Sequence, residues 1–284
     1  MKTFLFLALL LVARFSVAQP TSFSVVVVGK GQPILLIPGY SCSGEVWNET
    51  VDHLKDRYEC HVLTLPGFAG VPAIKNPVLA TVRDEIIQYI KTKKLRQPIL
   101  MGHSLGAFMS LWVSSREPSL VSKLICVDGV PFISAMMNPA TNADSLRKNP
   151  MYNADVVAQN FVNLPNGNYE TNMVKSMLTQ VSDTTRARQI ARWSALSDRR
   201  TLGYTLVEMS LTDLRNDIAR IQSPTLVLGS LYFNSQATSE RILTEQYKQL
   251  GHKTIAVAQT KHFIMYDDPQ WFYQQIDHFL QRAN

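Results

Sequence analysis

The sequence contains few cysteines, and their number is odd. The three cysteines are Cys42, Cys60 and Cys126, so at least one thiol is free or pairs between chains. Cys60 and Cys126 lie in apolar runs, where a cysteine is usually a small buried hydrophobic side chain. We therefore expect no disulfide. No spacing of Cys, His, Asp or Glu is typical of a metal site, and we expect no metal.

Concentrated charge is also absent. Lys and Arg number 28 against 22 Asp and Glu, which gives a net charge of +6, and this excess is spread along the chain without a basic run. A mild and dispersed excess does not predict nucleic acid as a partner. The sequence also shows no internal repeat and no low-complexity segment.

The only long apolar run lies at the N-terminus and is too short to cross a bilayer, which needs about 20 residues. Lys2 precedes the apolar residues 3–12, and the small residues 16–18 follow them. This order is typical of a signal peptide. We expect residues 1–18 to be removed, which lowers the net charge to +4 with the loss of Lys2 and Arg14, and the mature chain to be secreted or periplasmic. A buried first strand or helix is the alternative. The residue directly after the cleavage site is Gln19 and not a cysteine that could carry a lipid, so no stable membrane anchor is expected.

The rest of the chain alternates between two patterns. Short apolar, β-branched runs predict strands at 24–28, 34–37, 60–65, 99–101, 124–127, 225–228 and 254–257. Amphipathic patterns between them predict helices near 46–55, 78–94, 105–115, 239–249 and 269–281. Such alternation indicates an α/β fold with a mostly parallel twisted sheet and helices on both of its faces.

One long interval interrupts this alternation. Between the strands ending at 127 and beginning at 225 the sequence is helix-like and rich in Met and aromatic residues. A loop of this length is improbable in a compact domain. We interpret residues 131–205 as a helical cap inserted into a core of residues 19–130 and 206–284, with an extension of the core as the alternative. Met136, Met137 and Trp193 are our candidates for binding substrate.

The strongest motif is Gly-His-Ser-Leu-Gly at residues 102–106. A short buried strand precedes it and a helix follows it, which is the setting of a nucleophile elbow, where glycines flank an exposed serine. Ser104 is therefore the candidate nucleophile. A helix-capping serine in a glycine turn is the alternative.

A serine hydroxyl needs a base to accept its proton. Among six histidines, His262 is the candidate because it follows the last predicted strand and precedes the final helix. An oxyanion needs backbone N–H donors. The amide of Leu105, directly after the nucleophile, is one candidate. The amide of Tyr40, in the loop after the strand at 34–37, is the other.

Together these motifs resemble the α/β-hydrolase superfamily over nearly the whole mature chain. The segments that carry the resemblance appear in the family's order, and they are 34–40, Trp47, 63–70, 102–106, 223–229 and 262–263. Two positions depart from the family's pattern. Pro38 stands where many members have histidine, and no carboxylate follows Gly229, where the family usually has its acid.

The resemblance therefore leaves the third catalytic residue open. Some members of the superfamily carry the acid one strand earlier, and that position is Asp128 in this sequence. Asp128 is our candidate, although it could simply cap a turn. Asn234 and Glu240 are the alternatives.

The resemblance also implies a function. We expect a cofactor-free serine hydrolase acting on a small-molecule ester with a small to medium apolar acyl group. A cofactor-free haloperoxidase or a C–C bond hydrolase is possible on the same scaffold, because a fold does not fix a function. A ligand-binding or signalling protein with slow turnover is a further alternative.

Overall fold

A computed structural model of the protein describes residues 21–165 and 167–281. The predicted signal peptide, residues 1–18, lies outside these ranges. No helix within them is long and apolar enough to span a bilayer. The three cysteines are buried and unpaired.

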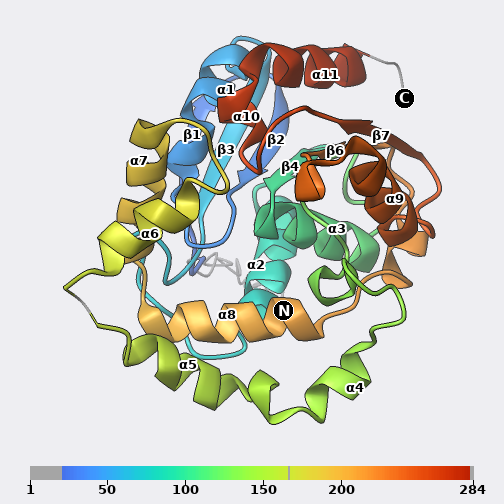
Figure 1. Cartoon of the computed structure of the whole chain (residues 1–284). Coiled ribbons are helices and arrows are strands. Elements are labelled where there is room, and N and C mark those ends of the chain that lie inside the picture. Colours follow the sequence, from blue (N-terminus) through green and yellow to red (C-terminus); the bar gives the residue numbers. More distant parts are fainter. Residues whose placement is uncertain (1–20, 166, 282–284) are drawn as a thin grey trace, which may run out of the picture.

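The centre of the described chain is a seven-stranded sheet in the order β1-β3-β2-β4-β5-β6-β7 (Figure 1). β1 pairs with β3 in antiparallel orientation, and the other pairings are parallel. All seven predicted strands are confirmed, and they are β1 (Ser24–Gly29), β2 (Gln32–Ile37), β3 (Tyr58–Thr64), β4 (Ile99–His103), β5 (Lys123–Val127), β6 (Thr225–Gly229) and β7 (Lys253–Val257).

Helices cover both faces of this sheet (Figure 1). One face carries α2 (Val78–Thr92), α3 (Leu105–Arg116) and α9 (Gln236–Gln246), and the other carries α1 (Asn48–Leu54), α10 (Ile264–Asp267) and α11 (Pro269–Gln281). The predicted helix at 239–249 begins earlier than expected, because the Ser235 side chain caps its first turn by accepting a hydrogen bond from the Thr238 amide.

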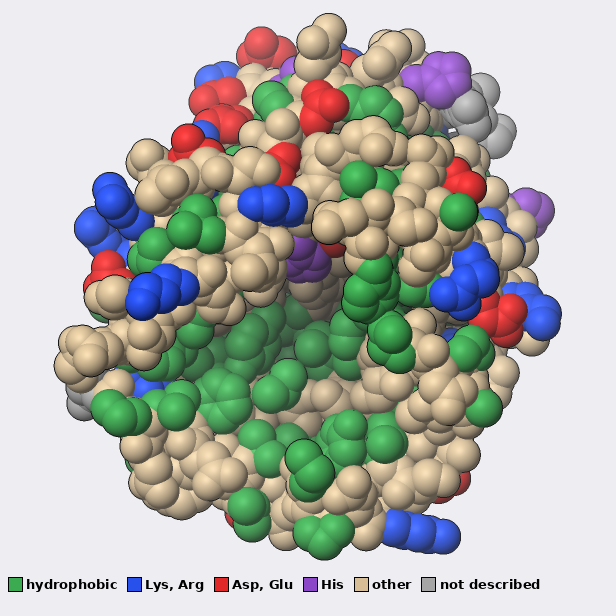
Figure 2. Space-filling model, in the orientation of Figure 1, with side chains coloured by type: hydrophobic (Ala, Val, Ile, Leu, Met, Phe, Trp, Pro, Cys, Tyr) green, Lys and Arg blue, Asp and Glu red, His purple; other side chains and the backbone are tan. Residues whose placement is uncertain are grey.

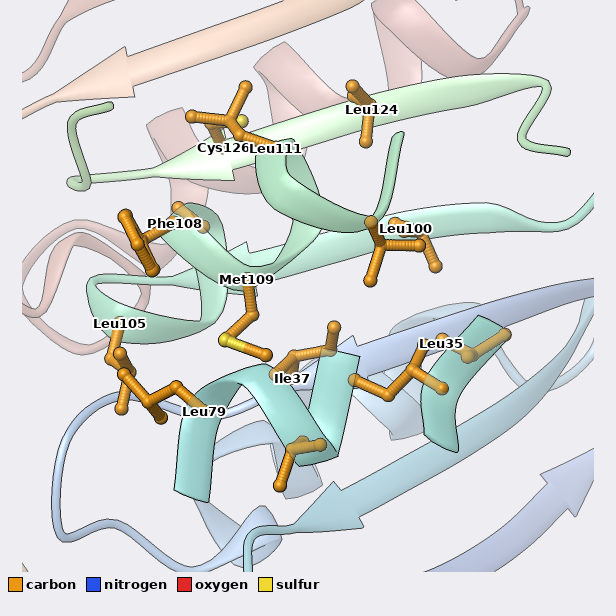
Figure 3. Packing of buried hydrophobic residues seen from close by; sticks show 14 of the residues in the cluster. Leu35, Ile37, Leu79, Leu100, Leu105, Phe108, Met109, Leu111, Leu124 and Cys126 are labelled. Carbon is orange, nitrogen blue, oxygen red and sulfur yellow. The ribbon is translucent and has the colours of Figure 1, made fainter. Parts of the chain in front are cut away.

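The strands are apolar on both sides because both sides are covered. Side chains alternate along a strand, so Leu35 and Ile37 pack with α2 and α3 while Ile34 and Leu36 pack with α1 and α11. Figure 3 shows side chains of the first of these layers, among them Ile37 of β2, Leu79 of α2 and Met109 of α3. Because β2 and β4 to β7 run parallel in this sheet, the loops at their carboxyl ends lie along one side of it.

The interval between β5 and β6 is helical, as the sequence predicts. It contains α4 (Ala143–Arg147), α5 (Ala154–Val162), α6 (Tyr169–Met177), α7 (Thr184–Ala195) and α8 (Arg199–Leu211), and no strand occurs among its described residues. The predicted boundary at 205/206 falls inside α8. Asp198 caps the start of this helix, and no helix-breaking residue follows residue 205 before the helix ends at Leu211.

Hydrogen bonds attach α8 directly to the core. The Asp198 amide donates to the Gly67 carbonyl oxygen over 2.7 Å. The Glu208 carboxylate accepts from the amides of Val78 and Leu79, each over 2.6 Å, at the start of α2. Pro77, at the N-cap of α2, offers no side-chain cap, so Glu208 satisfies amides that a helix start leaves without partners.

Candidate active site

Ser104 occupies a sharp turn between β4 and α3. Its backbone has φ 54° and ψ −116°, a conformation that costs about 1–3 kcal/mol for a residue with a side chain and persists only where the surroundings enforce it. The Ser104 amide donates to the Val127 carbonyl oxygen of β5, and the Ser104 carbonyl oxygen accepts from the amides of Ala107 and Phe108. The predicted strand, turn and helix arrangement around Ser104 is therefore present.

The flanking glycines are required by close backbone approaches. A Cβ atom at Gly102 would lie 2.0 Å from the Gly106 carbonyl oxygen, and one at Gly106 would lie 2.0 Å from the Ile37 carbonyl oxygen. Both distances are far below van der Waals contact. The glycines of the motif therefore let α3 start directly against β2 and β4, and they place Ser104 at the carboxyl end of β4.

The two amides predicted to stabilise an oxyanion lie on either side of this turn. Leu105 is the first residue of α3, so its amide has no carbonyl partner within the helix. Tyr40 lies in the loop after β2, and this loop contacts the nucleophile, because a Cβ atom at Gly39 would lie 3.4 Å from Ser104 Cβ. The structure thus brings both backbone segments to Ser104.

His262 and Asp128 are hydrogen-bonded to each other, although 134 residues separate them in the sequence. His262 Nδ1 donates to Asp128 Oδ2 over 2.5 Å. Asp128 follows β5 and is buried, whereas the His262 side chain is 25% exposed. A carboxylate at Nδ1 selects the imidazole tautomer with an unprotonated Nε2. Of the three residues considered for the acid, only Asp128 has this contact among the described residues; Asn234 and Glu240 are exposed in the loop after β6 and in α9.

Asp128 is held by Ser230, a residue that the sequence analysis missed. The Asp128 carboxylate accepts hydrogen bonds from the Ser230 amide over 2.7 Å and from Ser230 Oγ over 2.8 Å. Burial alone would raise the pKa of Asp128, but the hydrogen bonds from His262 and Ser230 outweigh burial and hold this pKa below its ordinary value. The sequence signal that could have identified Ser230 as a partner of the acid is its position directly after Gly229, where the family usually has the acid itself.

His103 is buried beside Ser104 and remains neutral. Its Nε2 donates to the His262 carbonyl oxygen over 3.1 Å, and its ring lies 4.5 Å from the His262 ring. Burial and the neighbouring His262 lower the pKa of His103 to about 3. His103 therefore orients the backbone of His262 and carries no charge in the neutral pH range.

Two cavities meet at Ser104 and His262. The smaller has a volume of about 170 Å³ and mostly apolar walls, including Phe108, Val130 and Met209. The larger has a volume of about 260 Å³, and Gln180 and Cys42 add polar atoms to its walls. Figure 2 shows that the face carrying the insertion is hollowed and that hydrophobic side chains line the hollow.

The three predicted substrate-binding residues have different positions. Met136 lines the smaller cavity. Met137 is 71% exposed and Trp193 is buried in the core, and neither lines the two cavities at Ser104. The prediction for Met137 and Trp193 is therefore corrected, because neighbouring residues on a turn or helix point in different directions. Ser194 and Ile190 of the same helix, α7, do line the larger cavity.

Within the described ranges, no group of three or more His, Cys, Asp or Glu side chains could hold a metal ion. The fold is that of the α/β-hydrolase class, and at its candidate site Ser104 shares the walls of two cavities with His262. The sequence profile of the alpha/beta hydrolase fold family matches residues 32–269. The chain belongs to this family.

Individual relatives cover most of the chain. The pimeloyl-[acyl-carrier protein] methyl ester esterase of Aeromonas hydrophila is 25% identical over 272 residues, which are 91% of this chain and 99% of that enzyme. Among solved structures, an esterase from Exiguobacterium antarcticum has a TM-score of 0.75 at 16% identity and covers 92% of this chain and 96% of its own. The enol-lactonase of Burkholderia xenovorans has a TM-score of 0.74 at 13% identity, with 92% and 96% covered. These structural similarities bear on the fold alone.

Proposed function

We propose that the protein is a serine hydrolase that cleaves carboxylic esters of small to medium apolar acids through an acyl-enzyme on Ser104. The observation that carries this proposal is that Ser104, with its strained backbone, lines the same two cavities as His262. His262 is in turn hydrogen-bonded to the buried Asp128. The name of the Aeromonas relative refers to ester cleavage, which supports the same reaction type here.

The reaction follows from the roles of these groups. Ser104 Oγ attacks the ester carbonyl carbon while His262 Nε2 accepts its proton, and the amides of Leu105 and Tyr40 stabilise the negative oxygen of the tetrahedral intermediate. When the intermediate collapses, the C–O bond breaks and the leaving alcohol takes the proton from His262. Water then attacks the acyl-enzyme with His262 as base, and the acid is released. Asp128 stabilises the imidazolium that forms in both steps.

The cavities limit the size of the substrate. Their volumes are about 170 and 260 Å³, so each half of the substrate has limited space, and together the two cavities reach the range of about 300–1,000 Å³ that is typical of pockets for drug-sized ligands. The smaller cavity has the more apolar walls, so we assign the acyl group to it and the alcohol to the larger cavity. No part of this chemistry requires a cofactor, and the partner is a small-molecule ester.

A panel of chromogenic esters with graded acyl length tests the function. We expect hydrolysis of short and medium acyl esters, together with stoichiometric labelling of Ser104 by an organophosphate, detected by peptide mass. Labelling without ester turnover would instead favour the slow-turnover binding protein, and the absence of both would contradict the proposal. A halide- and peroxide-dependent assay on the same sample distinguishes the haloperoxidase alternative.

Acyl-chain preference is expected to change in Met209→Ala, because Met209 narrows the smaller cavity. Each buried CH₂ contributes about 0.8 kcal/mol, so room for two further carbons should raise kcat/KM for the longer ester by about tenfold relative to the parent. The measurement is kcat/KM across the ester panel. Met177→Ala, in the larger cavity, should change the preference for the alcohol instead, and Met151→Ala, 79% exposed, should change neither. A shift of acyl preference in Met177→Ala alone would reverse our assignment of the cavities.

We further propose that the protein is exported and is secreted or periplasmic, on the basis of the small residues 16–18 after an apolar run. The exported form is expected to begin at Gln19. N-terminal sequencing or intact-mass measurement of exported protein checks this, and retention of Met1 would contradict it.

A further inference from the structure

The Tyr40 side chain connects the loop after β2 to the insertion. Its hydroxyl donates a hydrogen bond of 2.7 Å to the Leu202 carbonyl oxygen of α8. The Tyr40 ring packs edge-on against Phe68 with the ring centroids 5.5 Å apart. Burial, followed by the nearby Tyr169, raises the pKa of Tyr40 well above its ordinary value, so the hydroxyl keeps its proton and remains a donor in any assay.

The partner of this hydroxyl is itself fixed in space. Glu208 and Asp198 form the hydrogen bonds to the core that are described above. In addition, the Ala69 amide donates to Ser197 Oγ over 2.9 Å, just before α8 begins. Thr201 packs so closely on Gly67 that a Cβ atom there would lie 2.6 Å from the threonine side chain. α8 is therefore held to the core at several points, and its Leu202 carbonyl is a stationary acceptor.

We propose that the Tyr40 hydroxyl is a positioning group that uses α8 to hold the Tyr40 amide at the oxyanion. On one side the loop is limited by close packing, since a Cβ atom at Gly39 would lie 2.8 Å from His103 Nδ1. On the other side the Tyr40–Leu202 hydrogen bond prevents the loop from moving away. The insertion thereby takes part in the chemical step without touching the reacting atoms. This inference rests on the proposed function.

The expected effect follows from the geometry that catalysis needs. Groups that stabilise a transition state must be held within about 0.5 Å of their productive positions, and a misplaced oxyanion donor loses most of its contribution while the ground-state ester binds as before. Loss of the Tyr40 hydroxyl should therefore lower kcat and leave KM nearly unchanged.

Tyr40→Phe tests the proposal because it removes the hydroxyl and keeps the ring. We expect kcat for a short ester to fall by about tenfold, which corresponds to about 1.4 kcal/mol, with KM within about twofold of the parent. Binding of butylboronic acid, which forms a tetrahedral adduct with a serine, should weaken by the same factor as kcat. Tyr204→Phe is the matched control, since this hydroxyl on the same helix donates to Asp155 over 2.9 Å. It should change neither quantity.

A double-mutant cycle with Glu208→Ala tests the role of α8. This substitution removes the two hydrogen bonds that Glu208 accepts from the start of α2. We expect it to lower kcat several-fold in the parent but to have no further effect in Tyr40→Phe, because both changes act through the position of α8. Additive losses, an equal loss in Tyr204→Phe, or a kcat within twofold of the parent in Tyr40→Phe would overturn the inference. All of these measurements require that the parent protein hydrolyses the ester and that this turnover is lost in Ser104→Ala. Absence of that turnover would overturn the proposed function instead.

Discussion

Replacing Ser104 with alanine is expected to lower ester turnover by about 10⁴ to 10⁶-fold, leaving only what binding and the oxyanion amides contribute. The substitution removes the one oxygen that we assign as the attacking atom, and an alanine side chain fits where a serine side chain fits. The measurement is kcat/KM for a short chromogenic ester, with organophosphate labelling as a second readout. His262→Ala is expected to cause a loss of the same order, because the hydroxyl then lacks its base.

Two controls separate chemistry from folding. His252 is exposed, so His252→Ala should retain parent activity. Ser104→Gly should abolish turnover and yet have a higher free energy of unfolding than Ser104→Ala, by about 1 kcal/mol or more, because glycine accepts the positive φ at this turn without strain. Near-parent turnover in Ser104→Ala or His262→Ala would refute the assignment of nucleophile and base.

Replacing Asp128 with asparagine is expected to lower turnover by about 10⁴-fold, which is the loss known from the equivalent change in serine proteases. A carboxylate at Nδ1 holds the imidazole in the tautomer that can accept the Ser104 proton, and it stabilises the imidazolium that follows. An amide can present its N–H₂ group to Nδ1 and so favour the other tautomer. The measurement is kcat at saturating ester, accompanied by thermal unfolding to show that the variant is folded.

Neighbouring residues provide graded controls for Asp128. Ser230→Ala removes one of the two Ser230 bonds to the carboxylate and leaves the amide bond, so its loss should be far smaller than that of Asp128→Asn. Asn234→Ala and Glu240→Gln should retain turnover. If Asp128→Asn is folded and keeps more than about a tenth of parent activity, against the loss expected of a triad acid, the role passes to one of these two residues.

Much of the fold was predictable because its signals are local. Each strand is a short apolar run between turn residues, and each core helix has apolar residues at spacings of three and four, such as Val78, Val82 and Ile86 in α2. The motif around Ser104 was predictable for the same reason. Its glycines, its strand and its helix lie within some twenty consecutive residues, so their relation does not depend on the rest of the chain.

Several features depended instead on residues that are distant in the sequence. The sequence favours Asp128 over Asn234 and Glu240 only by analogy with other members of the superfamily. The packing of β5 beside β6 shows that Asp128 meets both Ser230 and His262. The insertion was predicted as helical, but composition could not tell which of its Met and aromatic residues face the cavities. Met136 does, whereas Met137 and Trp193 do not.

By itself, the sequence determined the order of strands and helices, the turn that exposes Ser104 and the family to which the chain belongs. The tertiary structure alone decided the partner of His262, the walls of the cavities and the contact between Tyr40 and α8. The physical reason is that periodicity and turn chemistry act over a few residues, and over so short a distance the backbone geometry determines which side chains are neighbours. A hydrogen bond such as Tyr40–Leu202, with 162 residues between its partners, forms only after whole elements have packed.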